Sequence, residues 1–392
     1  MRFRFISSFT SKARPTAVAA GLILAATLAV ATPADAAGGA AWVGKENTQV
    51  KTGADYWTPE RMRSARPLPL PKVSAEAIAA NGTEADAVQP QGAPQGANGA
   101  RPSIQVGNEL ARKLFDVDPD ELAAAKAELD AYDALEGDDV GTSGGQFSST
   151  RVFPDAATTT YPYLAVGKLF FTIPGQGNFI CSGSVINKRV VLTAGHCVHN
   201  GNGSQGGYYT NFMFVPAYRN GTAPFGMWNW AFVLTTPTWF SGGAVFPNAA
   251  DYAMIETRDR NGHKIGDVCG FLGFQTLKLF PNHAHLLGYP ANLDSGERMH
   301  EVTAQSFQRS APNNVEYGSD MRGGSSGGPW VQNFGVVSSG TEGGTNPAEN
   351  RILGVTSYGY VETTPLRQGA AILDVRFTTL LNQLCAHQSG NC

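Results

Sequence analysis

Charged residues are scarce in this chain: Asp, Glu, Lys and Arg make up 16% of its 392 residues, against about 25% in an average soluble domain. The 29 basic and 32 acidic residues leave a net charge of −3, which gives no electrostatic basis for binding nucleic acid. Cysteine is also rare, with five residues and none before Cys181. Beyond the N-terminal region, no stretch approaches the 18 consecutive apolar residues of a membrane span. Glycine is plentiful, with 46 residues, and favours strands and turns over a helical bundle.

Residues 1–36 have the pattern of an export signal. Four basic residues lie within residues 1–14, and an apolar run of 15 residues follows from Ala17 to Ala31. Ala34-Asp35-Ala36 then supplies a small–x–small cleavage pattern. A retained membrane anchor is the alternative, although the run is short for a span. The pattern predicts a secreted protein, extracellular or periplasmic, that has no membrane contact after signal removal.

Residues 37–151 carry 11 basic and 17 acidic groups and are predicted to form a pro-region. Residues 76–105 are rich in Ala, Gly, Pro and Gln, a composition that cannot order itself around a core of its own. In residues 108–136, Leu recurs among Ala, Asp and Glu, which predicts one or two acidic helices. We expect this pro-region to be an intramolecular partner that covers or chaperones the rest of the chain; a solvated linker is the alternative. The mature chain is predicted to start at Val152, after Arg151.

Residues 152–392 are predicted to form the functional domain. Short β-type runs, separated by Gly, Pro and Asn, follow one another from about residue 161, which predicts an all-β barrel or sandwich. The exception is the end of the chain. There Phe377, Leu380, Leu381 and Leu384 recur at the spacing of one amphipathic helix.

Three local patterns in this domain supply the groups of nucleophilic catalysis. They are Thr193-Ala194-Gly195-His196-Cys197, Asp251-Tyr252-Ala253-Met254-Ile255 and Gly324-Ser325-Ser326-Gly327-Gly328-Pro329. A serine hydroxyl needs an imidazole to take its proton, and the imidazole needs a buried carboxylate to fix its tautomer. Glycines beside the serine let backbone N–H groups point at an oxyanion.

The first and third motifs resemble the histidine and serine motifs of the chymotrypsin-type, or trypsin-like, serine peptidases. The resemblance covers about residues 152–392 and implies two six-stranded antiparallel β-barrels with a C-terminal helix. It implies a serine endopeptidase in which Ser326 is the nucleophile, His196 the general base and Asp251 the orienting carboxylate. The N–H groups of Gly324 and Ser326 would form the oxyanion hole. Ser325 stands where animal enzymes carry Asp, which places the chain nearer to bacterial members of the glutamyl-endopeptidase type.

Further residues are assigned to substrate binding by the same resemblance. Ser357 resembles the serine that hydrogen-bonds the triad aspartate, Tyr358 lies beside the substrate backbone, and Gly359 leaves the pocket mouth open. Asp320 lies six residues before the nucleophile, where it is either the acid of a pocket selecting Arg or Lys or a structural acid. Thr356 occupies the place of a histidine in the glutamyl-specific branch, which disfavours specificity for Glu.

The cysteines fit the same family, in which Cys181 and Cys197 match a disulfide across the histidine loop. Of the three that remain, Cys385 with Cys392 is the simplest second pair, which leaves Cys269. His196-x-x-His199 and His283-x-His285 have metal-like spacing but no set of carboxylates or thiolates beside them. We therefore predict that the protein binds no metal and no cofactor. We also predict that its substrates are proteins or peptides and that it is a monomer.

Two other functions are compatible with parts of the sequence. Gly324-x-Ser326-x-Gly328 also satisfies the nucleophile elbow of α/β-hydrolases, with Asp374 and His387 following in that order. That esterase needs a helix directly after the serine, where Gly328-Pro329 favours a turn into a strand. A catalytically inactive homologue acting as a binding module is the other alternative.

Overall fold

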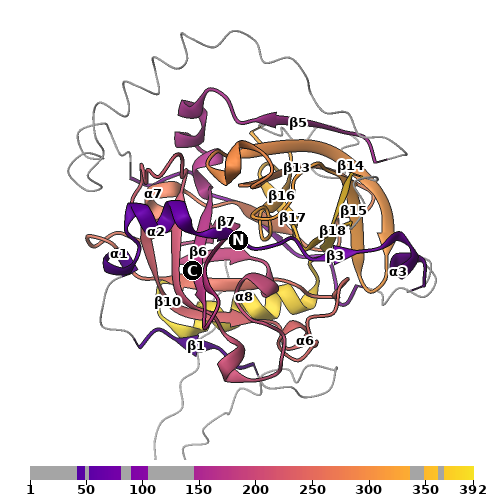
Figure 1. Cartoon of the computed structure of the whole chain (residues 1–392), viewed down its shortest axis with the longest axis horizontal. Coiled ribbons are helices and arrows are strands. Elements are labelled where there is room, and N and C mark those ends of the chain that lie inside the picture. Colours follow the sequence, from indigo (N-terminus) through magenta and orange to yellow (C-terminus); the bar gives the residue numbers. More distant parts are fainter. Residues whose placement is uncertain (1–41, 49–52, 81–89, 105–144, 336–347, 361–365) are drawn as a thin grey trace, which may run out of the picture. The chain divides into compact units, whose positions relative to one another are not determined.

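Two curved sheets, in which most strand pairs are antiparallel, make up most of the structure, which is a computed structural model (Figure 1). The structure describes residues 42–48, 53–80, 90–104, 145–335, 348–360 and 366–392. All of them belong to one compact unit, Ala41–Cys392. The predicted export signal and the acidic helices expected within residues 108–136 lie outside the described residues.

The first sheet closes on itself as a six-stranded barrel. Its strands are β6 (Val166–Ile173), β7 (Gly177–Asn187), β8 (Val190–Thr193), β9 (Thr210–Pro216), β10 (Trp228–Thr235) and β11 (Ala253–Thr257). They pair in the order β10-β11-β8-β7-β6-β9, and β9 pairs again with β10. Every one of these pairings is antiparallel. Leu169, Val191 and Met254 are among the fully buried side chains of its core.

The second sheet forms the other barrel. Its strands are β13 (His283–Gly288), β14 (His300–Ser310), β15 (Asn314–Gly318), β16 (Pro329–Gln332), β17 (Arg351–Val355) and β19 (Arg367–Ala371). They follow the antiparallel order β19-β15-β14-β13-β16-β17. The two ends meet where Gly354 of β17 lies directly against Ala370 of β19. Two short strands extend this sheet: β12 (Gly273–Gln275) beside β17, and β18 (Tyr358–Tyr360) beside β19.

A helix ends the chain, as the sequence predicts. Helix α8 (Val375–His387) begins at Asp374, whose side chain accepts a hydrogen bond from the Arg376 N–H. The four side chains of the predicted stripe are buried against the first barrel, where α8 contacts β10 and β11. The all-β fold with a closed six-stranded antiparallel barrel and a C-terminal helix is confirmed.

Shorter helical turns connect these elements. They are α6 (Pro237–Phe240), α7 (Ile265–Cys269), and the 3₁₀ turns η1 (Asp155–Thr159), η2 (Tyr163–Ala165), η3 (Gly195–Cys197), η4 (Gln205–Gly207) and η5 (Asp294–Gly296). None of the helices within the described ranges is long and apolar enough to cross a membrane.

The described parts of the segment predicted as a pro-region lie on both barrels (Figure 1). Its elements are β1 (Lys45–Glu46), α1 (Gly53–Tyr56), α2 (Pro59–Ser64), β2 (Arg66–Pro67), β3 (Lys72–Val73), α3 (Ala75–Ala80), β4 (Gly96–Ala97) and β5 (Phe147–Arg151). Each strand adds to an existing sheet: β1 to β10, β2 to β7, β3 to β18, β4 to β12 and β5 to β14. Backbone pairing of this kind needs no apolar side chains, so the Gly-rich residues around β4 are ordered without a core of their own.

Candidate active site

His196 is held by two hydrogen bonds to one buried carboxylate. It lies in η3, directly after β8, and Asp251 lies directly before β11, the neighbouring strand. The His196 backbone N–H donates to Asp251 Oδ1 over 2.8 Å, and Nδ1 lies 2.7 Å from Oδ2. Asp251 is fully buried and His196 is 5% exposed. A carboxylate on Nδ1 fixes the tautomer that carries its proton there, and Nε2 is left as the basic nitrogen.

A third donor fixes the carboxylate itself. Ser357, between β17 and β18, donates its hydroxyl to Asp251 Oδ2 over 2.6 Å. The resemblance assigns this contact to Ser357, and the structure contains it. The arrangement joins the two barrels, because Asp251 belongs to the first and Ser357 to the second.

Ser326 is held by the backbone of the opposite barrel. The Ser182 N–H of β7 donates to the Ser326 carbonyl over 2.7 Å. The Ser182 hydroxyl donates to the Gly324 carbonyl over 2.9 Å and accepts the Tyr289 N–H over 2.9 Å. Ser182 thereby ties the loop around Ser326 to both barrels. The sequence motifs do not reveal this role, because Ser182 carries no signal beyond its place next to Cys181.

Gly327 cannot be replaced by a larger residue in this loop. It has a φ of +77°, and a Cβ there would lie 2.1 Å from Thr193 Oγ1 and 2.6 Å from the Ser182 carbonyl. The glycine of the serine motif is therefore required by close approach of the two barrels as well as by backbone conformation.

The proposed base nitrogen and the proposed nucleophilic oxygen have no hydrogen-bond partner among the described residues. His196 Nε2 and Ser326 Oγ are both buried, and neither makes a hydrogen bond within the described part of the chain. In substrate-free enzymes the base–nucleophile contact is often long and tightens when substrate binds.

Ser325 takes part in a neutral network rather than an ion pair. Its hydroxyl donates to the Arg322 carbonyl over 2.7 Å and accepts from Gln368 Nε2 over 3.0 Å. Gln368 is fully buried, and its Oε1 accepts from Ser319 over 2.9 Å. Gln368 is a second residue that the motifs do not reveal. It holds the loop that precedes Ser326 by uncharged hydrogen bonds.

The predicted substrate-binding residues lie near this loop in different surroundings. Tyr358 is fully buried, and its hydroxyl contacts Ser310 over 2.7 Å and Glu316 over 3.2 Å. Burial and the nearby Glu316 raise the pKa of Tyr358, so the side chain stays a neutral hydroxyl. Its backbone, with that of Gly359, forms β18 next to β3.

Asp320 has a partner on an added strand. It is 7% exposed, and its Oδ1 accepts from the Ser149 hydroxyl of β5 over 2.9 Å. β5 pairs with β14 over five residues, and Arg151 lies opposite His300. Val152 continues this pairing with a hydrogen bond to Met299 and is 4% exposed. The predicted cleavage point after Arg151 is therefore within paired backbone.

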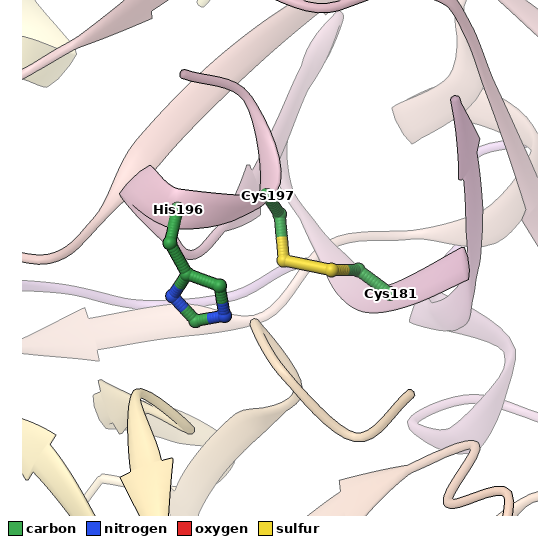
Figure 2. A group of neighbouring side chains, drawn as sticks. All are labelled: Cys181, His196 and Cys197. Atoms are coloured by element: carbon green, nitrogen blue, oxygen red, sulfur yellow. A yellow bond between two sulfur atoms is a disulfide. The ribbon is translucent and has the colours of Figure 1, made fainter. Parts of the chain in front are cut away.

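The cysteines form two disulfides. Cys181 joins Cys197 across 16 residues and Cys385 joins Cys392 across 7, while Cys269 is free and buried. Figure 2 shows the first disulfide beside the His196 ring. Among the described residues, these three side chains are the one group with the proximity of a metal site. Sulfurs joined in a disulfide are not thiolates, which are the form that binds metal, so the group does not fit one.

The other histidine patterns are occupied by protein groups. His199 has Ser204 O and the Gly201 N–H on its two ring nitrogens, and burial lowers its pKa. His285 contacts Glu301 through Nδ1. These contacts give both residues structural partners.

The residues of the esterase alternative do not assemble. Ser326 is followed by strand β16 rather than a helix. Asp374 lies at the start of α8, paired with Arg376 over 2.6 Å, and His387 lies at its end. The helix between them places these two residues about 20 Å apart along its axis. The α/β-hydrolase assignment is therefore wrong.

His387 instead bridges two acidic residues. Its ring lies 2.6 Å from Glu256 of β11 and 2.8 Å from Glu46 of β1. Burial acts to lower the pKa of His387, but the hydrogen bonds to both carboxylates outweigh it and raise the pKa.

The region that contains His196 is similar to a known protein family. Residues 157–213 match the family model described as Trypsin. The chain contains a trypsin-like domain. A curated relative of this chain, the glutamyl endopeptidase of Bacillus licheniformis, is 28% identical over 194 residues, which are 47% of this chain and 53% of the relative. A Bacillus subtilis protein named extracellular metalloprotease is 23% identical over 194 residues, 48% of this chain and 57% of that protein. The chain thus spans about half the length of these curated relatives.

Solved structures similar to this chain include three proteases. A thermostable serine protease AL20 from an extremophilic microorganism is 26% identical, with 57% of this chain and 98% of the other covered and a TM-score of 0.49. The protease Anisep from Arthrobacter nicotinovorans is 30% identical, with 56% and 94% covered and a TM-score of 0.46. A Glu endopeptidase is 23% identical, with 63% and 99% covered and a TM-score of 0.47.

Proposed function

We propose that the trypsin-like domain is a secreted serine endopeptidase that acts through His196, Asp251 and Ser326. The observation that carries the proposal is the state of the imidazole. Its Nδ1 is bound to the buried Asp251 carboxylate, and its Nε2 is buried with no partner among the described residues. An imidazole held in this way can act as a general base, because its Nε2 is free to accept a proton from a nucleophile.

The proposed reaction has two steps. In the first, Ser326 Oγ attacks the peptide carbonyl while His196 Nε2 takes its proton, and the N–H groups of Gly324 and Ser326 stabilise the oxyanion. His196 then gives this proton to the leaving amine, and an acyl-enzyme remains. In the second step a water molecule gives a proton to His196 and attacks the ester; His196 then passes this proton to Ser326 Oγ as the acid product leaves, which restores both residues. Asp251 stays ionised throughout and stabilises the imidazolium.

The precursor organisation belongs to the same proposal. A signal segment over residues 1–36 and a pro-region from residue 37 would precede the mature enzyme, and the pro-region would be its intramolecular partner. The strands β1, β2, β3 and β4 support such a partner, because each adds to a sheet of the domain. We place the processing point before β5 rather than after Arg151, since β5 and Val152 are paired with the second barrel and a peptidase requires an unpaired stretch.

Cleavage after Glu is not carried over from the curated relative. Thr356, at the place assigned to a histidine in that branch, is fully buried and accepts a hydrogen bond from Trp330 Nε1 over 2.9 Å. Threonine carries no positive charge with which to bind a carboxylate. Peptides and proteins are the proposed substrates, and the preferred residue is the outcome of a peptide-library measurement.

The test is Ser326→Ala in the full chain. We expect peptide hydrolysis to fall by about 10⁴-fold or more and labelling by a fluorophosphonate to disappear, with the circular dichroism spectrum unchanged. His387→Gln is the matched control, because His387 belongs to the rejected esterase triad, and it should retain both properties. Hydrolysis that persists in Ser326→Ala would refute the assignment. A wild type that neither hydrolyses peptides nor reacts with the probe, even after its pro-region is removed, would favour an inactive homologue that acts as a binding module.

A further inference from the structure

Residues 66–73, here called the crossing segment, run past the candidate site from one barrel to the other. At its start, β2 pairs with Phe179 and Ile180 of β7 in the first barrel. At its end, β3 pairs with Gly359 and Tyr360 of β18 in the second barrel (Figure 1). Both pairings are parallel. A peptide running the opposite way would pair antiparallel with both strands.

Between the two pairings, the crossing segment reaches the predicted oxyanion hole. The Leu68 carbonyl accepts the Gly324 N–H over 3.2 Å, and the Leu68 N–H donates to the Ile180 carbonyl over 3.0 Å. The segment also passes close to Gly323, where a Cβ would lie 2.9 Å from the Leu68 oxygen and 3.5 Å from the Leu70 nitrogen. A donor that should stabilise an oxyanion is therefore already occupied by the chain itself.

Side chains hold the crossing segment on both sides of this contact. Leu70 is 5% exposed and lies against Gly359, where a Cβ would meet its side chain at 2.6 Å. Val73 is 4% exposed and packs in one cluster with Tyr358 and Tyr360. At the other end, the Arg66 guanidinium lies 4.6 Å from the centre of the Phe179 ring. Lys72, in contrast, has an exposed side chain.

The direction of the crossing segment explains how it could bind without being cut. A peptide carbonyl carbon is bonded to an α-carbon on one side and to the nitrogen of the next residue on the other. If the chain direction is reversed while the carbonyl oxygen stays in place, these two atoms exchange sides. The nitrogen after Leu68 belongs to Pro69 and lies on the side of β18, toward which the chain continues. A substrate running antiparallel to β7 and β18 would have its leaving nitrogen on the side of β7. That side carries the disulfide between Cys181 and Cys197, next to His196.

Proline strengthens this protection. The crossing segment reads Arg-Pro-Leu-Pro-Leu-Pro-Lys-Val, so the bonds after Leu68 and Leu70 are both bonds to proline. A proline nitrogen carries no hydrogen and is enclosed by its ring, which hinders the approach of an imidazolium that must protonate it as the bond breaks.

We propose that the crossing segment is an inhibitory peptide ligand of the active site, bound in the direction opposite to substrate. It blocks the oxyanion hole with the Leu68 carbonyl and is anchored by Leu70. This rests on the proposed peptidase function. The site should accept the same class of ligand in trans, namely extended peptides with alternating proline and an aliphatic side chain at the position of Leu70.

The experiment measures how fast a fluorophosphonate labels the full-length chain, which a denaturing gel separates from shorter products. The reagent needs the oxyanion hole that Leu68 occupies. Leu70→Asp places a charge where the side chain is buried, and we expect the full-length band to be labelled about 10- to 100-fold faster than wild type. Lys72→Asp is the matched control in the same segment, with an exposed side chain, and should be labelled at the wild-type rate. Equal rates in Leu70→Asp and wild type would overturn the proposal.

A peptide added in trans covers the case in which the substitution disturbs folding. The peptide of residues 65–74, added to the full-length Leu70→Asp chain, should restore slow labelling and should remain intact by mass spectrometry. The same peptide with Asp at position 70 should not. Cleavage of the peptide, or no protection by it, contradicts the proposal. Labelling that is absent from every variant and every processed form would instead refute the peptidase function.

A cross-linking arm tests the direction. A photoreactive group on the lysine of the peptide should form its adduct near residues 358–360 of the second barrel. An adduct near residues 179–180 of the first barrel would show the substrate-like direction and refute the reversed one.

Discussion

Replacing Ser182 with alanine tests whether the loop around Ser326 depends on a side chain outside the triad. The substitution removes the hydroxyl that donates to the Gly324 carbonyl and accepts the Tyr289 N–H. Both backbone groups would then be buried without these partners, since Gly324 and Tyr289 are both buried. Each lost hydrogen bond contributes about 1 kcal/mol, and unsatisfied buried groups add to that. We expect the free energy of unfolding to fall by about 2–4 kcal/mol.

Ser182→Ala should also lower activity, because it displaces the Gly324 N–H and not because Ser182 takes part in the reaction. Gly324 supplies a proposed oxyanion donor, and a well-placed donor contributes about 3–4 kcal/mol to the transition state. Because Ser182 only orients that donor, we expect kcat to fall about 10- to 100-fold while KM changes less. The assays are urea unfolding followed by fluorescence, and ester and peptide hydrolysis by the active enzyme.

Ser184→Ala is the matched control for this experiment. Ser184 lies on the same strand, two residues further on, and is fully buried. Its hydroxyl has no hydrogen-bond partner within the described ranges, so its removal should leave stability and kcat nearly unchanged. If Ser182→Ala were as mild as Ser184→Ala in both measurements, the scaffold assigned to Ser182 would be wrong.

Three other outcomes can be measured independently. The carboxylates bridged by His387 raise its pKa above the unfolded-state value of about 6.5. The stabilising contribution of His387 is therefore complete below that pH and is lost as the pH rises through the folded-state pKa. His387→Gln should flatten this part of the plot of melting temperature against pH, and an unchanged profile would contradict the stabilising contact of His387 with Glu256 and Glu46. Asp320→Asn should keep the cleavage preference of wild type on a peptide library, because Ser149 holds the carboxylate; a loss of cleavage after Arg and Lys would make Asp320 a specificity acid. Burial raises the pKa of Cys269, so iodoacetamide should modify it only after unfolding, and rapid reaction in the folded protein would contradict its burial.

Much of the site could be predicted because its catalytic side chains lie in short sequence motifs that can be recognised without the structure. His196, Asp251 and Ser357 each carry a functional group whose partner types are known in advance, and the structure brings these three together. The amphipathic stripe of α8 could also be predicted, because the residues that a helix buries recur every three or four positions along the sequence.

The rest could not be predicted because it depends on backbone contacts between distant parts of the chain. The Leu68 carbonyl reaches the Gly324 N–H across more than 250 residues of sequence, and any residue type can supply a carbonyl. Ser182 and Gln368 are likewise ordinary polar residues until the fold buries them beside the serine loop. The pairing of β5 with β14 of the second barrel could not be predicted either, because the polar sequence of β5 gives no signal of burial.

The alternating prolines of the crossing segment also affect its conformational entropy. Pro67, Pro69 and Pro71 each fix φ near −65°, and proline also restricts the residue before it to extended backbone. The chain between Arg66 and Lys72 is therefore biased toward an extended shape before the barrels form. Less freedom is lost when it docks, by about 0.4–1 kcal/mol for each proline. Changing these prolines to alanine would therefore weaken the proposed self-bound state while leaving the Leu68 and Leu70 contacts available.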